Sequence, residues 1–236
     1  MVVVGAGIAG LVTTLELLEH GSGGRDGLLL VDRCHPYEVG GLAREAFGGM
    51  FMAGTGEQRR SGVHDSVELA LEDWLRVAEF NDEDVWPRRW AEAYVAGARD
   101  EVGGWLKRYG VRFFPVVNWA ERGVYGDGNS VPRFHLTWGC GQALVDAIWG
   151  AVRGHPGVEV RFGHRVSELI AGGARIVDEA SGAEYEASTA HIVIAAGGIG
   201  GNLDLVRTHW PSNLGNPPKE ILSLIHISEP TRQAEI

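Results

Sequence analysis

The sequence has few cysteines and no excess of basic residues. Only Cys34 and Cys140 occur in 236 residues, and they form no C-x-x-C pair. This argues against a disulfide framework, a structural zinc site and a dithiol redox centre. We expect both thiols to be small buried side chains in a cytoplasmic protein. The net charge of -10 does not fit the basic surface that nucleic-acid phosphates require, so no nucleic-acid partner is expected.

Long apolar runs are missing as well. No stretch approaches the ~18 consecutive apolar residues of a membrane span, and the first residues lack the basic start and cleavage site of a signal peptide. Apolar residues still make up 44% of the chain, which is enough for a buried core. Glycine is abundant, at 35 residues, and much of it is clustered. Such clusters favour close approach of the backbone to a ligand.

The chain begins with a strand, a glycine turn and a helix. Val2–Val4 is typical of a buried strand, and Ile8–His20 has apolar residues on one helical face. Between them, Gly5, Gly7 and Gly10 fit G-x-G-x-x-G, whose glycines allow a tight turn, approach of a pyrophosphate and close helix packing. The first turn of such a helix attracts phosphate through its free N–H groups and its dipole.

A carboxylate follows the next strand. Leu28–Val31 is apolar and ends at Asp32, where a carboxylate can accept hydrogen bonds from ribose hydroxyls. The pattern therefore predicts a dinucleotide site, but by itself it leaves NAD and FAD open. Further glycine clusters at 40–41, 48–49 and 197–201 favour a long ligand such as FAD, with tight turns that bind no ligand as the alternative.

The rest of the chain predicts an α/β fold. Helices are expected at Asp65–Phe80, Trp86–Tyr109 and Gln142–Val152, and strands at 111–117, Val158–Phe162, Val166–Ala171, Arg175–Asp178, Glu184–Ser188 and Ile192–Ala195. The early β-α-β unit and the last strand suggest a parallel sheet with helices on both faces. The four strands within 158–188 suggest an antiparallel β-meander inserted before the last parallel strand.

Several stretches together resemble the FAD-binding domain of the fumarate reductase/succinate dehydrogenase flavoprotein superfamily. Within it, they are most similar to bacterial dehydrogenases related to 3-ketosteroid Δ1-dehydrogenases. The stretches are VVVGAGIAGL, GGLAREAFGG, GEQRRSGVHDSVELALEDWL, VWPRRWAEAYV, GVRFFPVVNWAERGVYGDGNSVPRFHLTWG and AAGGIGGNLDLVRTHWP. The resemblance implies a Rossmann-like FAD-binding domain. It also implies an FAD-dependent dehydrogenase that moves hydride to flavin N5 from a C–C bond next to a carbonyl.

The resemblance also implies the residues of the cofactor site. By role they are Gly5, Gly7, Ile8, Ala9 and Gly10 on the pyrophosphate; Asp32 and Arg33 on the adenosine ribose; Gly41, Ala43, Phe47, Gly48 and Gly49 along the ribityl chain and flavin; Val166 on adenine; and Ala195, Ala196, Gly197 and Asn202 at the closing strand and helix. Two departures from the family stand out. Ala46 replaces a frequent Ser or Thr, and Leu42 stands about where covalent members carry His, so non-covalent FAD is expected.

The resemblance assigns no catalytic residue to this chain. Tyrosines act in the steroid dehydrogenases, and arginine and histidine act in the fumarate reductases. His135 and Tyr125 are candidates, and Tyr94 and Tyr109 lie in the same region. Each tyrosine has packing with a surface hydroxyl as its alternative role, and His135 has that of a polar residue hydrogen-bonded in a glycine-rich turn. Arg133 could orient a carboxylate or carbonyl, with an ordinary surface ion pair as the alternative.

Tryptophan is frequent, and helix packing is its expected role. The residues concerned include Trp86, Trp90 and Trp105. A platform for a steroid is the alternative reading.

The last residues, LSLIHISEPTRQAEI at 222–236, do not fit this pattern. They resemble a translated sequencing-library adapter. We therefore expect residues 1–221 to be an incomplete FAD-binding domain, residues 222–236 not to be native, and the substrate-capping domain of the family to be missing. The chain by itself is then expected to be inactive.

Several function classes stay open. The first is a dehydrogenase acting on a small molecule, steroid-like or a carboxylate, with an open electron acceptor. The second is a fumarate-reductase-like flavin reductase or another flavin oxidase, and the third is a non-catalytic FAD-binding fragment. An NAD-dependent enzyme would be favoured if NADH, and not FAD, raised the melting temperature.

Overall fold

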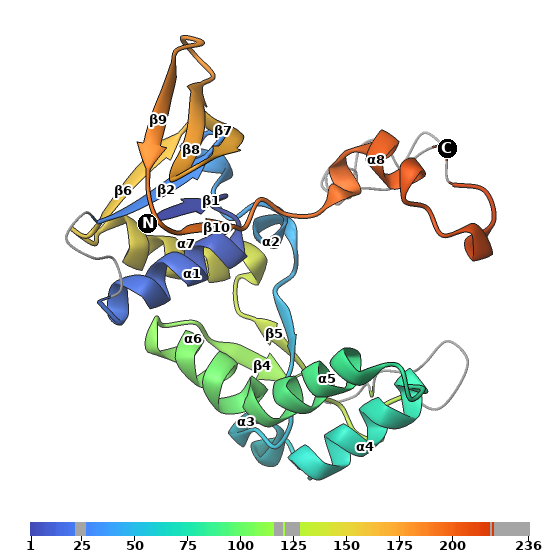
Figure 1. Cartoon of the computed structure of the whole chain (residues 1–236). Coiled ribbons are helices and arrows are strands. Elements are labelled where there is room, and N and C mark those ends of the chain that lie inside the picture. The colour runs from blue at the N-terminus through green and yellow to red at the C-terminus, as the bar shows by residue number, and fades with distance from the viewer. Residues whose placement is uncertain (22–26, 116–119, 121–127, 218, 220–236) are drawn as a thin grey trace, which may run out of the picture. The chain divides into compact units, whose positions relative to one another are not determined.

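The chain forms two compact units in a computed structural model that describes residues 1–21, 27–115, 120, 128–217 and 219 (Figure 1). The first unit comprises residues 1–46 and 148–236, and the second comprises residues 47–147. The catalytic candidate Tyr125 and the adapter-like residues 222–236 lie outside the described residues. Among the described helices, none has both the length and the apolar character needed to cross a membrane.

A parallel sheet forms the centre of the first unit. Its strands are, in spatial order, β10 (Ile192–Ile194), β1 (Val2–Val4), β2 (Leu28–Asp32) and β6 (Val158–Phe162). Each neighbouring pair is parallel. The structure thus confirms the β-α-β pattern at the start of the chain and places the last strand beside the first.

One face of this sheet packs on helix α1 (Ile8–Glu19), as Figure 1 shows. The buried side chains of α1 include Leu11, Leu15 and Leu18, which the sequence placed on one face. Residues paired across parallel strands share a face, so Val3 and Leu30, both fully buried, point to the same side of the sheet.

The other face of the sheet is covered by strands. The meander β7 (His164–Ile170), β8 (Gly173–Asp178) and β9 (Glu184–Ser188) is antiparallel. Its buried Ile176 packs against Val2 and Val31 of the parallel sheet. The expectation of helices on both faces is therefore wrong for this face. The meander also has three strands instead of four, because β6 pairs in parallel with β2.

Short elements complete the first unit. They are the 3-10 turns Pro36–Glu38, Ile199–Gly201 and Ser212–Leu214 and the helices α2 (Leu42–Glu45) and α8 (Leu203–Thr208). The Asn202 side chain accepts a hydrogen bond from the Leu205 N–H at 3.1 Å. Asn202 therefore caps α8, as the sequence led us to expect.

The second unit combines a small sheet with helices. Its elements are β3 (Gly49–Phe51), α3 (Gly56–Arg60), α4 (Val67–Ala78), α5 (Val85–Gly97), a π-helical stretch (Ala98–Gly104), α6 (Trp105–Arg108), β4 (Phe113–Pro115), β5 (Phe134–Thr137) and the first part of α7 (Cys140–Arg153). The sheet has the order β3-β5-β4, and both pairs are antiparallel. Strands β3 and β5 were not predicted.

The longer helices of the second unit agree with the sequence in extent, whereas α3 was not predicted. Ser66 caps α4 by accepting from the Leu69 N–H at 3.2 Å, and Pro87 lies in the first turn of α5, where its missing N–H is harmless. The predicted helix 86–109 is observed as α5, the π-helical stretch and α6 in succession. The π-helical stretch had no signal in the sequence.

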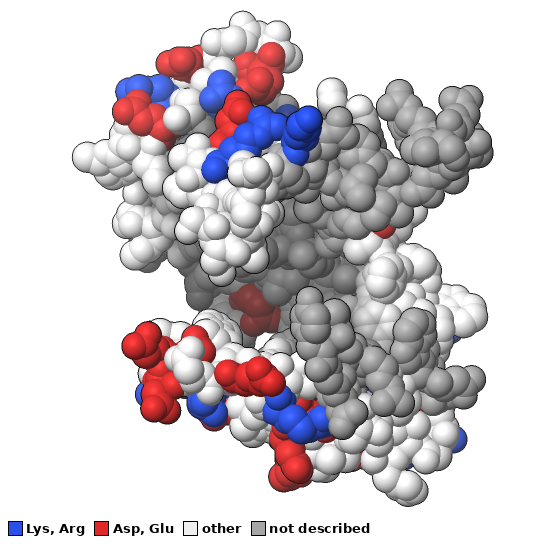
Figure 2. All heavy atoms as spheres, turned by 90° about the vertical axis from the view of Figure 1, so that its right-hand side faces the viewer, with Lys and Arg blue, Asp and Glu red and all other residues white. Residues whose placement is uncertain are grey.

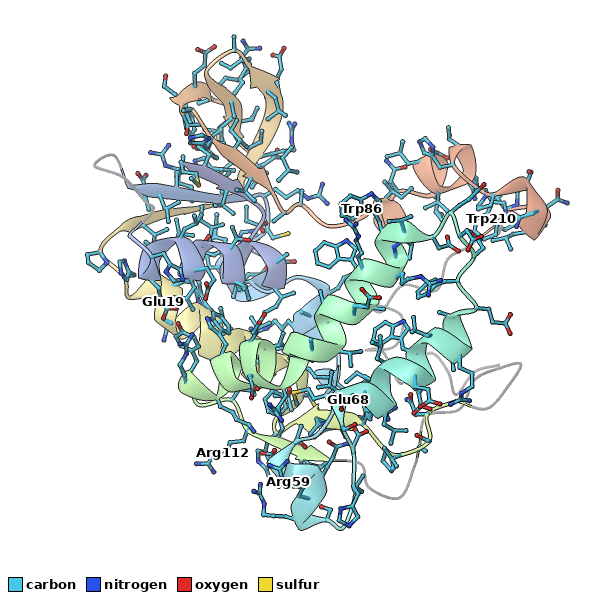
Figure 3. The ribbon with its side chains drawn as sticks, turned by 60° about the horizontal axis from the view of Figure 1, so that its bottom comes forward. Glu19, Arg59, Glu68, Trp86, Arg112 and Trp210 are labelled. Atoms are coloured by element: carbon cyan, nitrogen blue, oxygen red, sulfur yellow. The ribbon has the colours of Figure 1, made fainter. Side chains whose placement is uncertain are left out.

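Two expectations about burial are wrong. Cys140, the first residue of α7, is exposed, and Cys34 is partly exposed. Trp86 and Trp90 are 67% and 73% exposed, so they do not serve as packing residues among the described residues. Figure 3 shows Trp86 at the start of α5, where the Arg89 guanidinium lies 5.2 Å from the centroid of its ring.

Charged side chains of both signs alternate on the meander. Arg165 pairs with Glu179 at 2.6 Å, and Arg175 lies between Glu168 and Glu186. The face drawn in Figure 2 likewise shows acidic groups among the basic ones. Such exposed pairs contribute little to stability, and the described residues on that face form no continuous basic stripe.

Candidate cofactor site

The turn after β1 requires glycine at two positions for reasons of packing. Gly5 has φ +102°, and a Cβ there would lie 2.4 Å from the Ala195 carbonyl oxygen at the end of β10. A Cβ on Gly10 would lie 1.8 Å from the Gly5 carbonyl oxygen. These glycines bring β10, the turn and α1 into contact.

Gly7 is different, because nothing in the described chain fills the space of its side chain. It is the N-cap of α1 with φ -68°, a conformation open to any residue. The nearest described atom to its Cβ position is the Gly40 carbonyl oxygen, at 4.0 Å. The first turn of α1, with Ile8 and Ala9, has no acidic side chain, so its N–H groups and dipole suit an anion.

Asp32 supports this turn from the neighbouring strand. Its carboxylate accepts hydrogen bonds from the Ala6 N–H at 2.5 Å and from the Cys34 N–H at 2.8 Å. It is partly exposed, with exposed Arg33 beside it, so its oxygens retain lone pairs for a ligand. Burial, followed by the negative charge of Asp32, raises the pKa of the Cys34 thiol.

The Gly40–Gly41 pair also lies at this turn. The Gly40 N–H donates to the Ala6 carbonyl at 2.8 Å, and Gly40 forms a parallel bridge with Gly7. Gly41 has φ +54°, and its Cβ position is 3.5 Å from the Gly7 Cα. Ala43 follows, half-buried in α2. The structure therefore brings these residues to the start of α1.

The second glycine cluster begins where β10 ends. The Ala195 N–H donates to the Val4 carbonyl at 2.8 Å, which carries the strand pairing to the glycine turn. Ala196 and Gly197 follow and are exposed. For Gly197, Gly198 and Gly200, no atom of the described chain lies within 4 Å of a Cβ position. Contacts within the described chain therefore do not require glycine at these positions. This agrees with a backbone that a ligand approaches closely.

Val166, expected near adenine, lies on β7. Its side chain is partly buried and packs against the cluster of Val2, Val31 and Ile176. The β7–β8 pairing shifts register between Val166 and Glu168. A bulge of this kind leaves a backbone group unpaired, which suits the expected backbone contact.

The Gly48–Gly49 pair of the second unit is explained by internal packing. A Cβ on Gly48 (φ +63°) would meet the backbone of Cys140 at 3.0 Å, and a Cβ on Gly49 would lie 1.9 Å from the Phe134 ring. Phe47 is exposed and packs edge-on against the same ring. The sequence alone could not distinguish tight internal packing from the close approach of a ligand, because both require glycine.

The buried face of β5 is polar along its whole length. Arg133, directly before the strand, and His135 and Thr137 within it occupy alternate positions and are all buried. Each bonds to a different segment: Arg133 to Asp65 and Asp73, His135 to Thr55, and Thr137 to Gly48. Buried polar groups are stable only when paired, so the whole face depends on these partners.

Arg133 is not part of a surface ion pair, which corrects the expectation. Its side chain is 0% exposed. Its Nε donates to the Asp65 carboxylate at 2.9 Å, and its Nη1 donates to Asp73 Oδ2 at 2.6 Å and to Asn129 Oδ1 at 3.1 Å. Gln58 Nε2 also donates to Asp65 Oδ2, at 2.9 Å. With these donors engaged, Arg133 is placed to support the fold of the second unit.

His135 is engaged at both ring nitrogens. Its Nδ1 lies 2.7 Å from the Arg133 carbonyl oxygen, which can only accept, so Nδ1 carries a proton. Its Nε2 lies 2.9 Å from the Thr55 hydroxyl. A general acid or base must reach its substrate, so this burial favours the packing alternative.

The described tyrosines also have internal partners. The Tyr94 hydroxyl donates to the Phe51 carbonyl at 3.0 Å, and burial raises the pKa of Tyr94. The Tyr109 ring packs on Trp105, with 4.7 Å between the ring centroids. These contacts favour packing roles.

Asp73 makes the stability of the second unit depend on pH in the acid range. Burial disfavours its charge, but hydrogen bonds from Ser130, Arg133 and Arg76 outweigh burial and hold the pKa of the Asp73 carboxyl well below its usual range. Because the pKa of Asp73 is lower in the folded than in the unfolded protein, its ionised form stabilises the fold at pH values above the unfolded pKa of about 3.9. That stability is lost as the pH falls from this value toward the folded pKa.

We therefore expect Asp73→Asn to lower the free energy of unfolding by a constant amount between pH 8 and 5, and by less below about pH 4. Urea denaturation at a series of pH values measures this. Glu72→Gln, an exposed change on the same helix, is the control. A difference that stays constant down to pH 3 would contradict the assignment.

Comparisons with known proteins give the family of the chain. The family model described as FAD binding domain matches residues 1–223. A KsdD-like steroid dehydrogenase of Mycobacterium tuberculosis is 44% identical over 244 residues, with 94% of this chain and 42% of the relative covered. One from Mycolicibacterium smegmatis is 45% identical, with 94% and 44% covered.

Solved structures show the same fold. The open conformation of a flavocytochrome c3 fumarate reductase matches with a TM-score of 0.68 and 27% identity, over 89% of this chain and 36% of that chain. The chain thus spans less than half the length of the two curated relatives and of this solved structure.

Proposed function

Because the chain belongs to the FAD-binding domain family, whose model covers nearly all of it, we propose that FAD binds to its first unit at the turn between β1 and α1. The family is one of FAD-dependent oxidoreductases. Residues 1–221 form the FAD-binding part in this proposal, and the match to residues 1–223 supports that range.

The observation that carries the proposal is the open space at Gly7. Gly5 and Gly10 are required by contacts within the protein, but the fold makes no such demand on Gly7. A glycine at the start of a helix, facing open space, lets an anion reach the first N–H groups. We assign the pyrophosphate to Gly7, Ile8 and Ala9.

The other assignments follow from position. Asp32, with Arg33 beside it, is the acceptor for the adenosine ribose, because its carboxylate already lies at the turn. Gly41, whose Cβ position is 3.5 Å from the Gly7 Cα, and Ala43, two residues later, are assigned to the ribityl chain and flavin. Ala195, Ala196 and Gly197 close the site where β10 ends, and Val166 meets adenine through its backbone. Phe47, Gly48 and Gly49, which the resemblance places along the flavin, belong to the second unit.

We propose that the whole protein dehydrogenates a small molecule next to a carbonyl. Bound FAD supplies a hydride acceptor for this chemistry. The names of the mycobacterial relatives, at 44% and 45% identity, support a steroid-like substrate. In this proposal the described residues of the chain bind and orient the cofactor, and no described side chain is assigned to proton transfer.

A reductase acting on a carboxylate such as fumarate is the second candidate. The flavocytochrome c3 fumarate reductase structure favours it through its fold and 27% identity. Within the described residues, Arg133 is engaged by two aspartates and is not offered as a carboxylate ligand. Reoxidation of the reduced flavin by fumarate would support this candidate, and bleaching of the flavin by a 3-ketosteroid would support the first.

Non-covalent attachment is part of the proposal. Leu42 occupies the position where a covalent link would need His, and the segment between Gly40 and Gly49 contains no His. The proposal is tested by thermal unfolding of the chain with FAD or NADH, followed by acid precipitation of the flavin complex.

FAD at 100 times its Kd is expected to add about 2.7 kcal/mol of stability, whereas NADH adds none. All flavin is expected in the acid supernatant. Stabilisation by NADH alone would overturn the cofactor assignment, and flavin in the protein pellet would overturn non-covalent attachment.

A further inference from the structure

The second unit contains a pocket of about 340 Å³ between its small sheet and helix α7. It is lined by residues directly before β4, at the end of β5 and on α7, among them Val111, Arg112, Thr137, Trp138, Ala143 and Ala147. All of these lie within residues 47–147, so the pocket belongs to one unit. Its volume is at the lower end of the range for small-molecule sites, so a small ligand suits it better than a dinucleotide does.

Small apolar side chains form part of the pocket wall. Val111 is 6% exposed, and Ala143 and Ala147 are half-buried. The two alanines are four residues apart on α7 and therefore share one face of the helix. A larger side chain at either alanine would fill the space, so the pocket exists because α7 presents only methyl groups to it. Apolar surface of this kind favours a ligand with an apolar body.

Arg112 and Trp138 lie side by side at the pocket. The Trp138 N–H donates to the Arg112 carbonyl at 2.8 Å, which continues the antiparallel pairing of Phe113 with Thr137. Residues opposite each other in such a pair project to the same face of the sheet. Both side chains are exposed, Trp138 by 70% (Figure 3 labels Arg112). The Phe114 ring packs edge-on against the Trp138 ring, with 5.7 Å between the ring centroids.

The guanidinium of Arg112 is the charged group of the pocket. Within the described part of the chain it forms no hydrogen bond or ion pair, whereas Arg165 and Arg175 of the first unit are paired with glutamates. No acidic side chain is among the described residues that line the pocket. The planar guanidinium can bind a carboxylate through two parallel hydrogen bonds. Arg112 is therefore available to an anionic group of a ligand.

We propose that this pocket binds a small carboxylate with a flat apolar body, such as an aromatic acid. The carboxylate pairs with Arg112, and the apolar body enters the space beside Val111, Ala143 and Ala147. The Trp138 indole offers an aromatic surface next to the ligand. The site lies in the second unit, so it does not depend on the cofactor site proposed in the first.

The test measures binding of phenylacetate and of neutral phenylacetamide to the full chain by isothermal titration calorimetry. Arg112→Met removes the charge and keeps an unbranched apolar side chain, and Ala147→Leu fills the pocket. Arg89→Met is the matched control, because Arg89 is another exposed arginine beside an exposed indole, that of Trp86. Urea denaturation of each variant shows that it is folded. Inorganic phosphate is titrated separately as an anion without an apolar body.

The wild-type chain is expected to bind phenylacetate, and Arg112→Met to raise the Kd by roughly 10- to 100-fold, as loss of a hydrogen bond to a charged group implies. Phenylacetamide is expected to bind the wild type more weakly by a similar factor. Ala147→Leu should abolish binding, and Arg89→Met should leave the Kd unchanged. No binding of phenylacetate by the folded wild-type chain, an unchanged Kd in Arg112→Met, or tighter binding of phosphate than of phenylacetate would overturn the proposal.

Discussion

Replacing Gly7 with Ala is expected to weaken FAD binding by roughly 10- to 100-fold, the effect of one methyl group in a filled contact, with little change in the fold. The structure offers the new Cβ open space, with the Gly40 carbonyl oxygen 4.0 Å away. The backbone angle of Gly7 is also acceptable for alanine. The methyl group would instead stand where we place the pyrophosphate. Fluorescence titration with FAD and thermal unfolding of the free chain measure the two effects.

Gly150→Ala is the control for this prediction. Gly150 lies in α7, and its Cβ position also has no described atom within 4 Å. Alanine is a better helix former, so this variant should be slightly more stable and bind FAD normally. If Gly7→Ala bound FAD like the wild type, the pyrophosphate would not lie at this turn.

The second large effect is expected at Arg133. Arg133→Met leaves Asp65 and Asp73 buried without their shared cation, and removing one partner of a buried pair lowers stability by about 3–5 kcal/mol. The side chains of Arg133 and Asp65 are both 0% exposed, so water cannot compensate. Urea denaturation followed by tryptophan fluorescence measures the loss, since Trp74 and Trp105 lie in this unit.

Two further variants make the Arg133 result specific. Arg165→Met removes an exposed pair with Glu179 and should change stability by less than about 1 kcal/mol. Adding Asp65→Asn and Asp73→Asn to Arg133→Met should recover part of the loss, because the uncompensated charges are gone. If Arg133→Met lowered the free energy of unfolding by no more than Arg165→Met does, the network around Arg133 would not be tightly buried.

The parts of the fold with strong local patterns could be predicted from the sequence. Val2–Val4 and Leu28–Asp32 are apolar runs bounded by glycine and aspartate, and Leu11, Leu15 and Leu18 repeat with helical spacing. The glycine turn between them has a fixed spacing and a clear physical role. These signals are local, so they need no knowledge of tertiary contacts.

The rest depended on contacts between distant residues. Nothing local shows that Ile176 packs on the parallel sheet, and β6 could not be separated from the meander because its parallel partner β2 is far away in the sequence. The charge of Arg133 suggested the surface, yet Asp65 and Asp73 from another part of the chain make its burial stable. The ion pairs formed in the folded protein therefore determine where Arg133 lies, and its residue type alone predicted the wrong location.

The glycines show the same limit within the candidate site. Gly7 and Gly49 look alike in the sequence, since each belongs to a glycine cluster next to a strand. In the structure Gly7 faces open space, whereas the Gly49 Cβ position is filled by the Phe134 ring. Only the first is evidence for a ligand by itself.

The most direct test of the central claim is a crystal structure of the chain with FAD, examined for the position of the pyrophosphate. We expect it against the N-terminus of α1 beside Gly7, with the adenosine ribose at Asp32. Pyrophosphate bound at any other part of the chain, with the β1–α1 turn in contact only with solvent, would contradict the account.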